Sequence, residues 1–501
     1  MPEAVLAIDQ GTTGSTALVL DRDGRVLGRA TEEFTQYYPQ PGWVEHDPEE
    51  IWRVSLEVIG TALGNAGLAD GDLRAVGITN QRETAVVWDR TTGEPLHRAI
   101  VWQSRQTADI CQEIRDNGLE PMITERTGLV VDPYFSGSKL KWILDRYPEA
   151  RPRAEAGELV FGTIDTWILY KLTGGEVFAT EPTNASRTLL YDIRKLAWDP
   201  ELLEIFGVPE AMLPEVKPSS GVFGTTVPAG ALPGGVPVAG IAGDQQAALY
   251  GQGCWQPGMV KNTYGTGCFV MVNTGSELQR SCCGMLTTVC CDATGGAAYA
   301  LEGSIFTTGA AVQWLRDEMG LIGSAVETEE IASRVHDTQG VYVVPAFAGL
   351  GAPYWDMDAR GAIVGLTRGS GREQIIRATL DSIAYQTRDV IDAMNNDFAE
   401  PMLELRADGG AAANNHLMQF QADILGVPVV RPQLLETTAA GSAFLAGLAT
   451  GMWRDPDELE GAWREDRRFD PAMDADQRER LYAGWRDAVE RVRADRREAV
   501  R

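Results

Sequence analysis

Two apolar runs near the start of the chain, residues 6–8 and 17–20, enclose a short stretch of Asp, Gln, Gly, Thr and Ser. Apolar runs around a polar turn are typical of a β-hairpin. Gly11 and Gly14 allow a tight turn and a close approach of the backbone to a ligand. The N–H groups and hydroxyls of such a turn can converge on an anion such as a phosphate. An ordinary tight hairpin, whose polar residues satisfy only local backbone groups, explains the same pattern.

A second stretch of the same design lies near the middle of the chain. Its Gly265-Thr266 pair mirrors Gly11-Thr12, and its flanking apolar runs have matching length. This repetition indicates an internal duplication, with one phosphate-binding hairpin in each of two lobes and a nucleotide in the cleft between them. Asp9, at the end of the strand before the first turn, would then face a metal ion.

The length and charge of the chain limit what it can do. At about 150 residues per domain, 501 residues predict two to four units, and we expect two large lobes. A composition of 44% hydrophobic and 23% charged residues is typical of a folded globular protein. The net charge of −27 repels nucleic acids and anionic membrane surfaces, so a small ligand is the expected partner.

The chain shows neither an export signal nor a membrane segment. Its first residues lack a basic region, and no run of about 18 apolar residues occurs, so we expect a cytoplasmic protein with no integral membrane segment. Seven cysteines without an export signal favour free thiols over disulfides. Cys282-Cys283 and Cys290-Cys291 suggest a metal centre, but neighbouring strand residues point to opposite faces and no CxxC spacing occurs. We therefore expect no metal there.

Polar residues follow several predicted strands. Arg82 and Glu83 come directly after a buried strand at residues 75–79, where they can offer donors and acceptors to the hydroxyls of a polyol. A surface ion pair is the alternative. Trp102 lies at another strand end, and Tyr134 lies in a loop before a predicted helix, where each can contact a ligand or simply pack.

Asp244 occupies a corner between a predicted strand and a predicted helix. An apolar strand stops at Gly243, and a helix-forming Gln-Ala-Ala run follows. A carboxylate held at such a corner suits a general base, an N-cap, or both. Further on, a strand at residues 403–406 leads into Gly409-Gly410, a turn whose backbone can approach a ligand closely.

The usual phosphate-binding motifs are missing. The sequence contains no GxxxxGK[ST], no HRD and no DFG. If phosphates bind, the hairpins at residues 9–16 and 263–269 must hold them.

Taken together, these stretches resemble the FGGY carbohydrate-kinase family, and the resemblance extends over nearly the whole chain. Three further stretches strengthen it: PGWVEHDP (41–48), WLRDEM (314–319) and GLGAPYWD (349–356). The principal motifs are DQGTT (9–13), NQRET (80–84), DPYFSG (132–137), GDQQAA (243–248), NTYGTGCF (262–269) and DGG (408–410).

The resemblance implies an α/β fold of two ribonuclease-H-like domains, of the actin and hexokinase type, that flank an ATP cleft. Residues 1–248 would carry the polyol and phosphate site, and residues 249–501 the nucleotide site. The implied reaction is the ATP-dependent phosphorylation of glycerol to sn-glycerol 3-phosphate, with ADP as the other product. A kinase for another polyol or ketose, and a non-catalytic actin-like nucleotide-binding protein, are the alternatives. A homo-oligomer, dimer or tetramer, is expected.

Residue roles follow from the same resemblance. Asp244 would be the catalytic base, and Asp9 would organise Mg²⁺. Glycerol would be held by Arg82, Glu83, Trp102, Tyr134, Asp244 and Gln245, with Phe269 against its carbon face. ATP would contact Thr12, Thr13, Gly14, Thr266, Gly309, Gln313, Gly410 and Asn414.

One departure affects the first hairpin. The family commonly carries an arginine shortly after the turn, in a pattern like Gly-Thr-Thr-Ser-Ser-Arg, and this chain has Thr16 there. A cation near the phosphates is therefore missing, and nucleotide affinity or rate is expected to differ.

Overall fold

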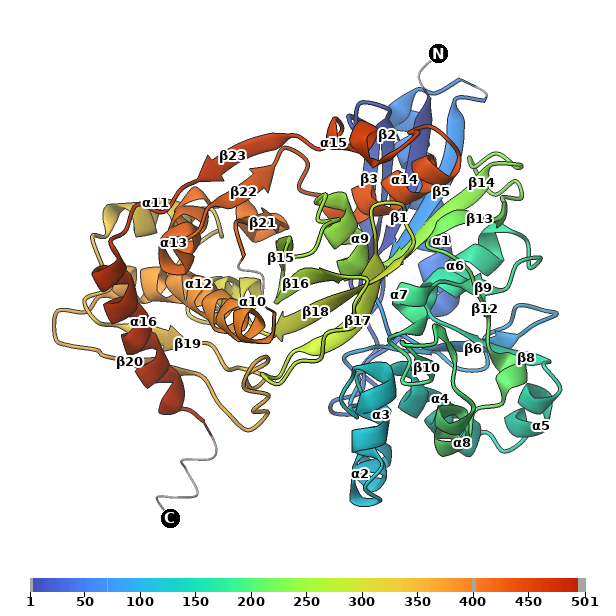
Figure 1. The fold of residues 1–501 in the computed structure, drawn as a ribbon, viewed down its shortest axis with the longest axis horizontal. Coiled ribbons are helices and arrows are strands. Elements are labelled where there is room, and N and C mark those ends of the chain that lie inside the picture. Colours follow the sequence, from blue (N-terminus) through green and yellow to red (C-terminus); the bar gives the residue numbers. More distant parts are fainter. Residues whose placement is uncertain (1–2, 70, 399–401, 494–501) are drawn as a thin grey trace.

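The structure is a computed structural model that describes residues 3–69, 71–398 and 402–493 (Figure 1). Its first large sheet contains six strands in the order β13-β14-β5-β1-β2-β3. β1 pairs antiparallel with β2 and parallel with β5, so the predicted first hairpin sits at the centre of the sheet. The strands are β1 (Ala4–Gln10), β2 (Gly14–Asp21), β3 (Val26–Glu33), β5 (Leu73–Asn80), β13 (Ser220–Thr225) and β14 (Pro237–Gly243).

The second large sheet contains seven strands in the order β17-β18-β16-β15-β21-β22-β23. Its central hairpin is β15–β16, the second predicted hairpin, and β15 pairs parallel with β21. The strands are β15 (Val260–Tyr264), β16 (Cys268–Gly275), β17 (Leu286–Cys291), β18 (Ala297–Ile305), β21 (Leu405–Asp408), β22 (Val429–Pro432) and β23 (Glu465–Phe469).

The two sheets repeat one topology. In each, two antiparallel pairings join three strands, and two parallel pairings then extend the sheet from the first of the three. Thus β1, β2, β3, β5 and β14 correspond to β15, β16, β18, β21 and β22. The internal duplication predicted from the two hairpins is confirmed, and both turns lie at the same place in their sheets.

Helices cover both sheets, and each domain has a core of its own. The long helix α12 is central to the second domain, whereas α1 packs against β2 and β3 of the first. None of the helices among the described residues combines the length and apolar character that crossing a membrane requires. The longer helices are α1 (Pro48–Ala66), α2 (Ala108–Asp116), α4 (Ser136–Arg146), α6 (Ile164–Leu172), α10 (Gly309–Asp317), α12 (Arg372–Asp397), α13 (Asn415–Leu425), α14 (Thr437–Ala449) and α16 (Ala475–Glu490).

Shorter elements complete the chain. Five two-stranded sheets are formed by β4 (Glu45–His46) with β7 (Ala99–Ile100), β6 (Val86–Asp89) with β8 (Leu159–Gly162), β9 (Ala179–Thr180) with β12 (Glu215–Val216), β10 (Tyr191–Asp192) with β11 (Ala197–Trp198), and β19 (Tyr342–Val344) with β20 (Ala362–Val364). The short helices are α3 (Glu120–Thr127), α5 (Ala150–Glu155), α7 (Pro182–Ala185), α8 (Pro200–Phe206), α9 (Asp244–Gly251), α11 (Glu327–Arg334) and α15 (Pro456–Glu460), with 3₁₀ turns at Glu210–Met212 and Gly410–Ala413.

Helix α14 returns from the second half of the chain to the first sheet. It packs against α9, β5, β14 and β1, as Figure 1 shows. Small residues make this packing close: a Cβ on Gly441 would lie 1.9 Å from the carbonyl oxygen of Ala247, and one on Gly251 would lie 2.0 Å from that of Thr437. The predicted division of the chain at 248/249 falls inside α9 and stays a prediction.

Candidate active site

A buried ion cluster lies where β5 ends. Arg82 is 2% exposed. Its Nε lies 3.1 Å from Oδ1 of Asp244, and its Nη1 and Nη2 lie 2.5 and 3.1 Å from the two carboxylate oxygens of Glu302. Arg187 donates to both Glu302 and Glu83. Although burial disfavours its charge, Arg187 and Arg82 lower the pKa of Glu302 to about 2. The cluster therefore holds Arg82 fixed beside Asp244.

Glu83 is held in a backbone conformation that is rare for a residue with a side chain. Its φ is +61°, and residues kept in this region cluster at functional sites. Two groups at the start of α4 hold it there: the hydroxyl of Ser136 and the ammonium of Lys139 both donate to its carbonyl oxygen. Burial raises the pKa of Glu83 despite the nearby Arg187 and Arg82.

Asp244 is the first residue of α9, and Gly243 is the N-cap. The carboxylate of Asp244 accepts a hydrogen bond from the N–H of Gln245 at 2.7 Å. The prediction that Asp244 is an N-cap is wrong, because no side chain caps this helix. The side chain is 27% exposed, unlike the fully buried carboxylates around it. Asp9 lies close enough that burial, together with the charge of Asp244, raises its pKa to about 7. The two carboxylates thus lie within electrostatic reach of each other beside the first turn.

Aromatic side chains surround this cluster. The rings of Trp102 and Tyr134 meet edge to face with centroids 5.4 Å apart. The Phe269 ring lies 5.9 Å from the guanidinium carbon of Arg82, and Arg187 lies over the Tyr134 ring. These rings provide apolar surface next to charged groups, as a molecule with both carbon and hydroxyl faces requires.

The turn between β1 and β2 is fastened by side chains from two other segments. Nε2 of Gln81 donates to the carbonyl oxygen of Gly11 and to Oε1 of Gln10, both at 3.1 Å. The indole N–H of Trp102 donates to the hydroxyl of Thr12 at 2.9 Å. This bond joins the predicted phosphate turn to the aromatic wall. Thr13 is exposed on the turn, and Gly14 begins β2.

The turn between β15 and β16 is fastened instead by the start of α10, through backbone N–H groups and the hydroxyl of Thr308. The N–H of Gly309 donates to Gly265, and the N–H groups of Thr308 and Ala310 donate to Thr266. A Cβ on Gly309 would lie 2.5 Å from the carbonyl oxygen of Gly265, so only glycine fits there. Thr266 and Gln313 are exposed beside this turn.

The remaining predicted nucleotide residues follow β21. A Cβ on Gly409 would lie 2.6 Å from the carbonyl oxygen of Tyr264, which places the start of this segment against the second turn. Gly410 is exposed, and Asn414 caps α13 by accepting from the N–H of Leu417 at 3.0 Å. The predicted residues therefore form two groups, a charged and aromatic group around Asp244 and a glycine-rich group around the second turn.

Comparison with known families matches both halves of the chain. The sequence model described as the FGGY family of carbohydrate kinases, N-terminal domain, matches residues 4–251, and that of the C-terminal domain matches residues 260–450. This chain belongs to the FGGY family of carbohydrate kinases. The family resemblance and the two-domain α/β fold predicted from the sequence are confirmed.

Curated relatives of this FGGY kinase share most of its length. A glycerol kinase of Caldanaerobacter subterraneus is 59% identical over 98% of this chain and 99% of the relative. Glycerol kinase 2 of Thermotoga maritima is 57% identical over 97% of this chain and 98% of the relative. Among solved structures, the glycerol kinase of Plasmodium falciparum with ADP gives a TM-score of 0.91 at 36% identity, covering 98% of both chains. A xylulose kinase of Lactobacillus acidophilus, with a TM-score of 0.85 at 21% identity over 97% of this chain and 98% of that one, shares the fold.

Sequence reasoning missed several residues of this kinase site. Glu302 on β18 and Arg187 after α7 complete the ion cluster, but neither lies in a recognisable pattern. Lys261 is different, because it is a lone cation in the short strand β15, which is buried over most of its length. Its ammonium donates to Oε1 of Gln245 at 2.6 Å and to the carbonyl oxygen of Phe269 at 3.2 Å. That isolated charge could have been recognised as a buried site residue.

Proposed function

We propose that this FGGY kinase transfers the γ-phosphoryl group of ATP to a terminal hydroxyl of glycerol, giving sn-glycerol 3-phosphate and ADP. The observation that carries the proposal is the partly exposed carboxylate of Asp244, held by Arg82 at 3.1 Å. The curated relatives named glycerol kinases, 57–59% identical over nearly the full chain, support the same reaction.

The residues around Asp244 fit a small polyol. Arg82 offers donors and Glu83 offers acceptors, so both can bind hydroxyl groups. Trp102 and Phe269 supply the apolar surface for the carbon face. The family alternatives are a kinase for another polyol or a ketose, and a protein that only binds nucleotide. A protein that only binds nucleotide would not need the buried cluster of Arg82, Arg187 and Glu302, whose charges cost free energy to desolvate.

In the proposed mechanism, the carboxylate of Asp244 accepts the proton of the terminal hydroxyl as that oxygen attacks the γ-phosphorus. The Nε of Arg82 orients the carboxylate, which keeps one oxygen aimed at the hydroxyl. N–H groups of the turns at Gly11–Gly14 and Gly265–Gly267 stabilise charge on the phosphate oxygens. Closure of the two domains excludes water as a competing nucleophile.

Asp9 fits the proposed Mg²⁺ site. Hard carboxylate oxygens are the ligands that Mg²⁺ takes, and a pKa raised to about 7 marks a carboxylate whose charge lacks a compensating cation. When bound, Mg²⁺ would neutralise charge on the β- and γ-phosphates. A cytoplasmic location and a dimeric or tetrameric assembly stay predictions.

Steady-state kinetics of Asp244→Asn tests the proposal. The amide keeps the shape but cannot accept the proton, so kcat should fall by about 10²-fold or more while KM for glycerol stays within a few-fold. Asp145→Asn, on the outer part of α4, is the matched control and should retain kcat. A near wild-type kcat for Asp244→Asn would contradict the base, and faster turnover of dihydroxyacetone, erythritol or xylulose than of glycerol would contradict the substrate.

A further inference from the structure

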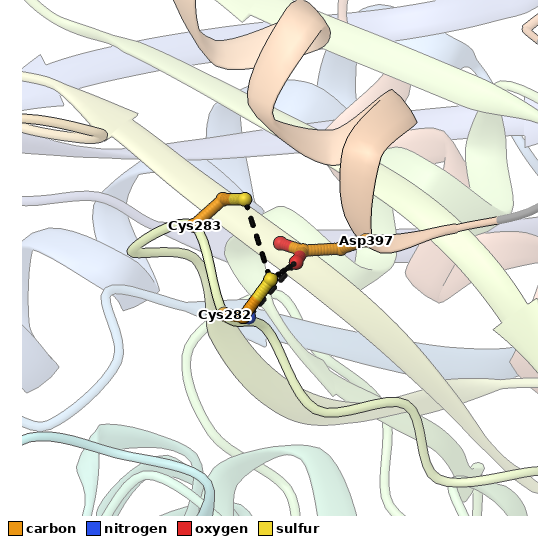
Figure 2. Close-up of side chains that lie close together, drawn as sticks. All are labelled: Cys282, Cys283 and Asp397. Carbon is orange, nitrogen blue, oxygen red and sulfur yellow. Dashed lines mark hydrogen bonds between the residues drawn. The ribbon is translucent and has the colours of Figure 1, made fainter.

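Two adjacent thiols and a carboxylate meet at the surface of the second domain, and none of them belongs to the proposed site. Figure 2 shows Cys282 and Cys283, in the connection between β16 and β17, beside Asp397 at the end of α12. The two Sγ atoms are 3.5 Å apart, and Sγ of Cys282 lies 3.2 Å from Oδ1 of Asp397. The structure places no other group of three or more potential ligands so close together among its described residues.

These spacings are close to the edges of a zinc coordination tetrahedron. Bond lengths of about 2.3 Å to sulfur and about 2.0–2.2 Å to oxygen give ligand separations of about 3.8 Å between two sulfurs and about 3.5–3.7 Å between sulfur and oxygen. The observed separations of 3.5 and 3.2 Å are each within about 0.5 Å of these edges. Small side-chain rotations would therefore bring all three atoms to bonding distance of one ion.

The carboxylate is already oriented by its neighbours. The N–H of Cys282 donates to Oδ1 of Asp397 at 2.8 Å, and the hydroxyl of Ser281 donates to Oδ2. The Oγ of Ser281 in turn accepts from the N–H groups of Cys283 at 3.0 Å and Met285 at 2.8 Å. Such second-layer hydrogen bonds fix ligands in metal sites and raise affinity.

The geometry points to a binding site for a soft divalent cation, of the Zn²⁺ or Cd²⁺ type, held by Cys282, Cys283 and Asp397 with water in the fourth position. Two thiolates select such ions over Mg²⁺, which prefers oxygen ligands. Solvent reaches the site, because Cys282 is exposed and Cys283 is half-buried, whereas the other five cysteines are buried. A metal centre formed by all four cysteines, which the sequence suggested, does not form, because Cys290 and Cys291 lie buried on β17.

The ion would fasten a segment that touches both domains. Arg280, next to the site, donates to carbonyl oxygens of Thr124 and Glu125 on α3 of the first domain. On the other side, the indole N–H of Trp355 donates to the carbonyl oxygen of Gly284 at 2.6 Å. Binding at Asp397 would tie this connection to the end of α12, so it should raise the melting temperature of the folded protein by mass action.

Metal binding must displace protons from the thiols. The hydrogen bond with Cys282, burial and the charge of Asp397 together raise the pKa of the Cys283 thiol to about 11. Because a metal ion binds the thiolate and releases its proton, affinity for the ion should increase as pH rises.

Titration of the full-length, reduced protein with Cd²⁺ tests the site, because cadmium thiolates absorb in the ultraviolet. We expect saturation at about one ion per chain, protection of two thiols from alkylation and a higher melting temperature. Zn²⁺ should compete with Cd²⁺, and Mg²⁺ should not.

Three variants assign the ligands. Cys282→Ser and Cys283→Ser should each weaken Cd²⁺ binding by about 10-fold or more, and Asp397→Asn by a smaller factor. Cys111→Ser, which removes a buried thiol in α2, is the matched control and should bind as the wild type does. Cd²⁺ binding that persists unchanged in a Cys282→Ser/Cys283→Ser variant, or no saturable thiolate absorption in the wild type, would overturn the inference.

Discussion

The two hairpin turns that face the proposed cleft share a backbone design but are fastened in different ways. In each, the N–H of the first glycine, Gly11 or Gly265, donates to a carbonyl oxygen across the turn at 2.9 Å. The first turn is then held by side chains, namely Gln81 and Trp102. The second is held by the start of α10, through the N–H groups of Thr308, Gly309 and Ala310 and through the hydroxyl of Thr308.

This difference indicates which substitution tests the support of each turn. The first turn adjoins the proposed polyol residues, and Trp102 links it to the aromatic wall, so substitution of a polar side chain should disturb it. The second turn adjoins glycine-rich segments, and there an added Cβ should disturb it. Steric sensitivity is shared, since a Cβ on Gly14 would lie 2.5 Å from the carbonyl oxygen of Glu32. Gln81 is therefore the position that tests the side-chain support of the first turn, and Gly309 is the position that tests the second turn.

The largest effect is expected at the second turn. Gly309→Ala places a Cβ 2.5 Å from the carbonyl oxygen of Gly265, so the turn must shift at a cost of about 1–3 kcal/mol. KM for ATP should rise about 10- to 100-fold, with KM for glycerol changed less. Initial-rate kinetics measures both. Gly64→Ala in α1, where a Cβ meets nothing within 4 Å, is the control. An unchanged KM for ATP would remove the second turn from the nucleotide site.

A loss of stability at low pH is expected from a histidine that lies behind the first turn. His46 is buried between Gln36 and Gln81, and burial lowers its pKa to about 3. The unfolded chain, with a histidine pKa of about 6.5, binds the proton more readily, so stability is lost as pH falls from about 6.5 towards 3. Between about pH 7.5 and pH 5 this loss amounts to about 2 kcal/mol.

Melting temperatures at these two pH values check the prediction. His46→Gln should reduce the acid-induced drop in melting temperature. His336→Gln replaces a histidine whose side chain is 99% exposed and should leave the drop unchanged. Equal drops in His46→Gln and wild type would show that other groups cause the acid sensitivity.

A smaller effect is expected from Gln81→Leu, which keeps the volume but removes the amide. The carbonyl oxygen of Gly11 and the hydroxyl of Thr84 each lose a hydrogen-bond partner, at about 1 kcal/mol. KM for ATP should rise about 5-fold, measured by initial rates. Gln419→Leu, on α13, is the control. If Gln81→Leu leaves the kinetics unchanged, the first turn does not depend on side-chain support.

The smallest effect concerns Thr16. It pairs with Asp9 across β1 and β2, so the two side chains lie on the same face of the sheet. A guanidinium there should bind phosphate oxygens, and Thr16→Arg should tighten ATP binding about 3-fold in a calorimetric titration. Thr31→Arg, one strand further out, carries the same charge as a control. Equal tightening in both variants would indicate general attraction rather than a contact.

Much of the architecture could be read from the sequence. Apolar runs of strand length around Gly-Thr turns predicted both central hairpins, and their similarity predicted the duplicated topology. The long helix α12 is local in the same sense, since its apolar residues between Ile376 and Met394 recur at helical spacing. These features are local, because the spacing of apolar residues and the residue types of a turn depend only on neighbouring residues. Asp244, Arg82 and Glu83 were likewise found at strand ends, where polar residues interrupt an apolar pattern.

Only the tertiary structure decided what these residues touch. Arg82 and Glu302 are 220 positions apart, and no local sequence pattern indicates that they share two hydrogen bonds. The same holds for Cys282 and Asp397, which are brought together by the packing of a connection against the end of a helix. The sequence by itself determined the elements and the polar residues at their ends. The packing of the two domains decided the charge partners, because Coulomb and hydrogen-bond energies depend on distances in space rather than along the chain.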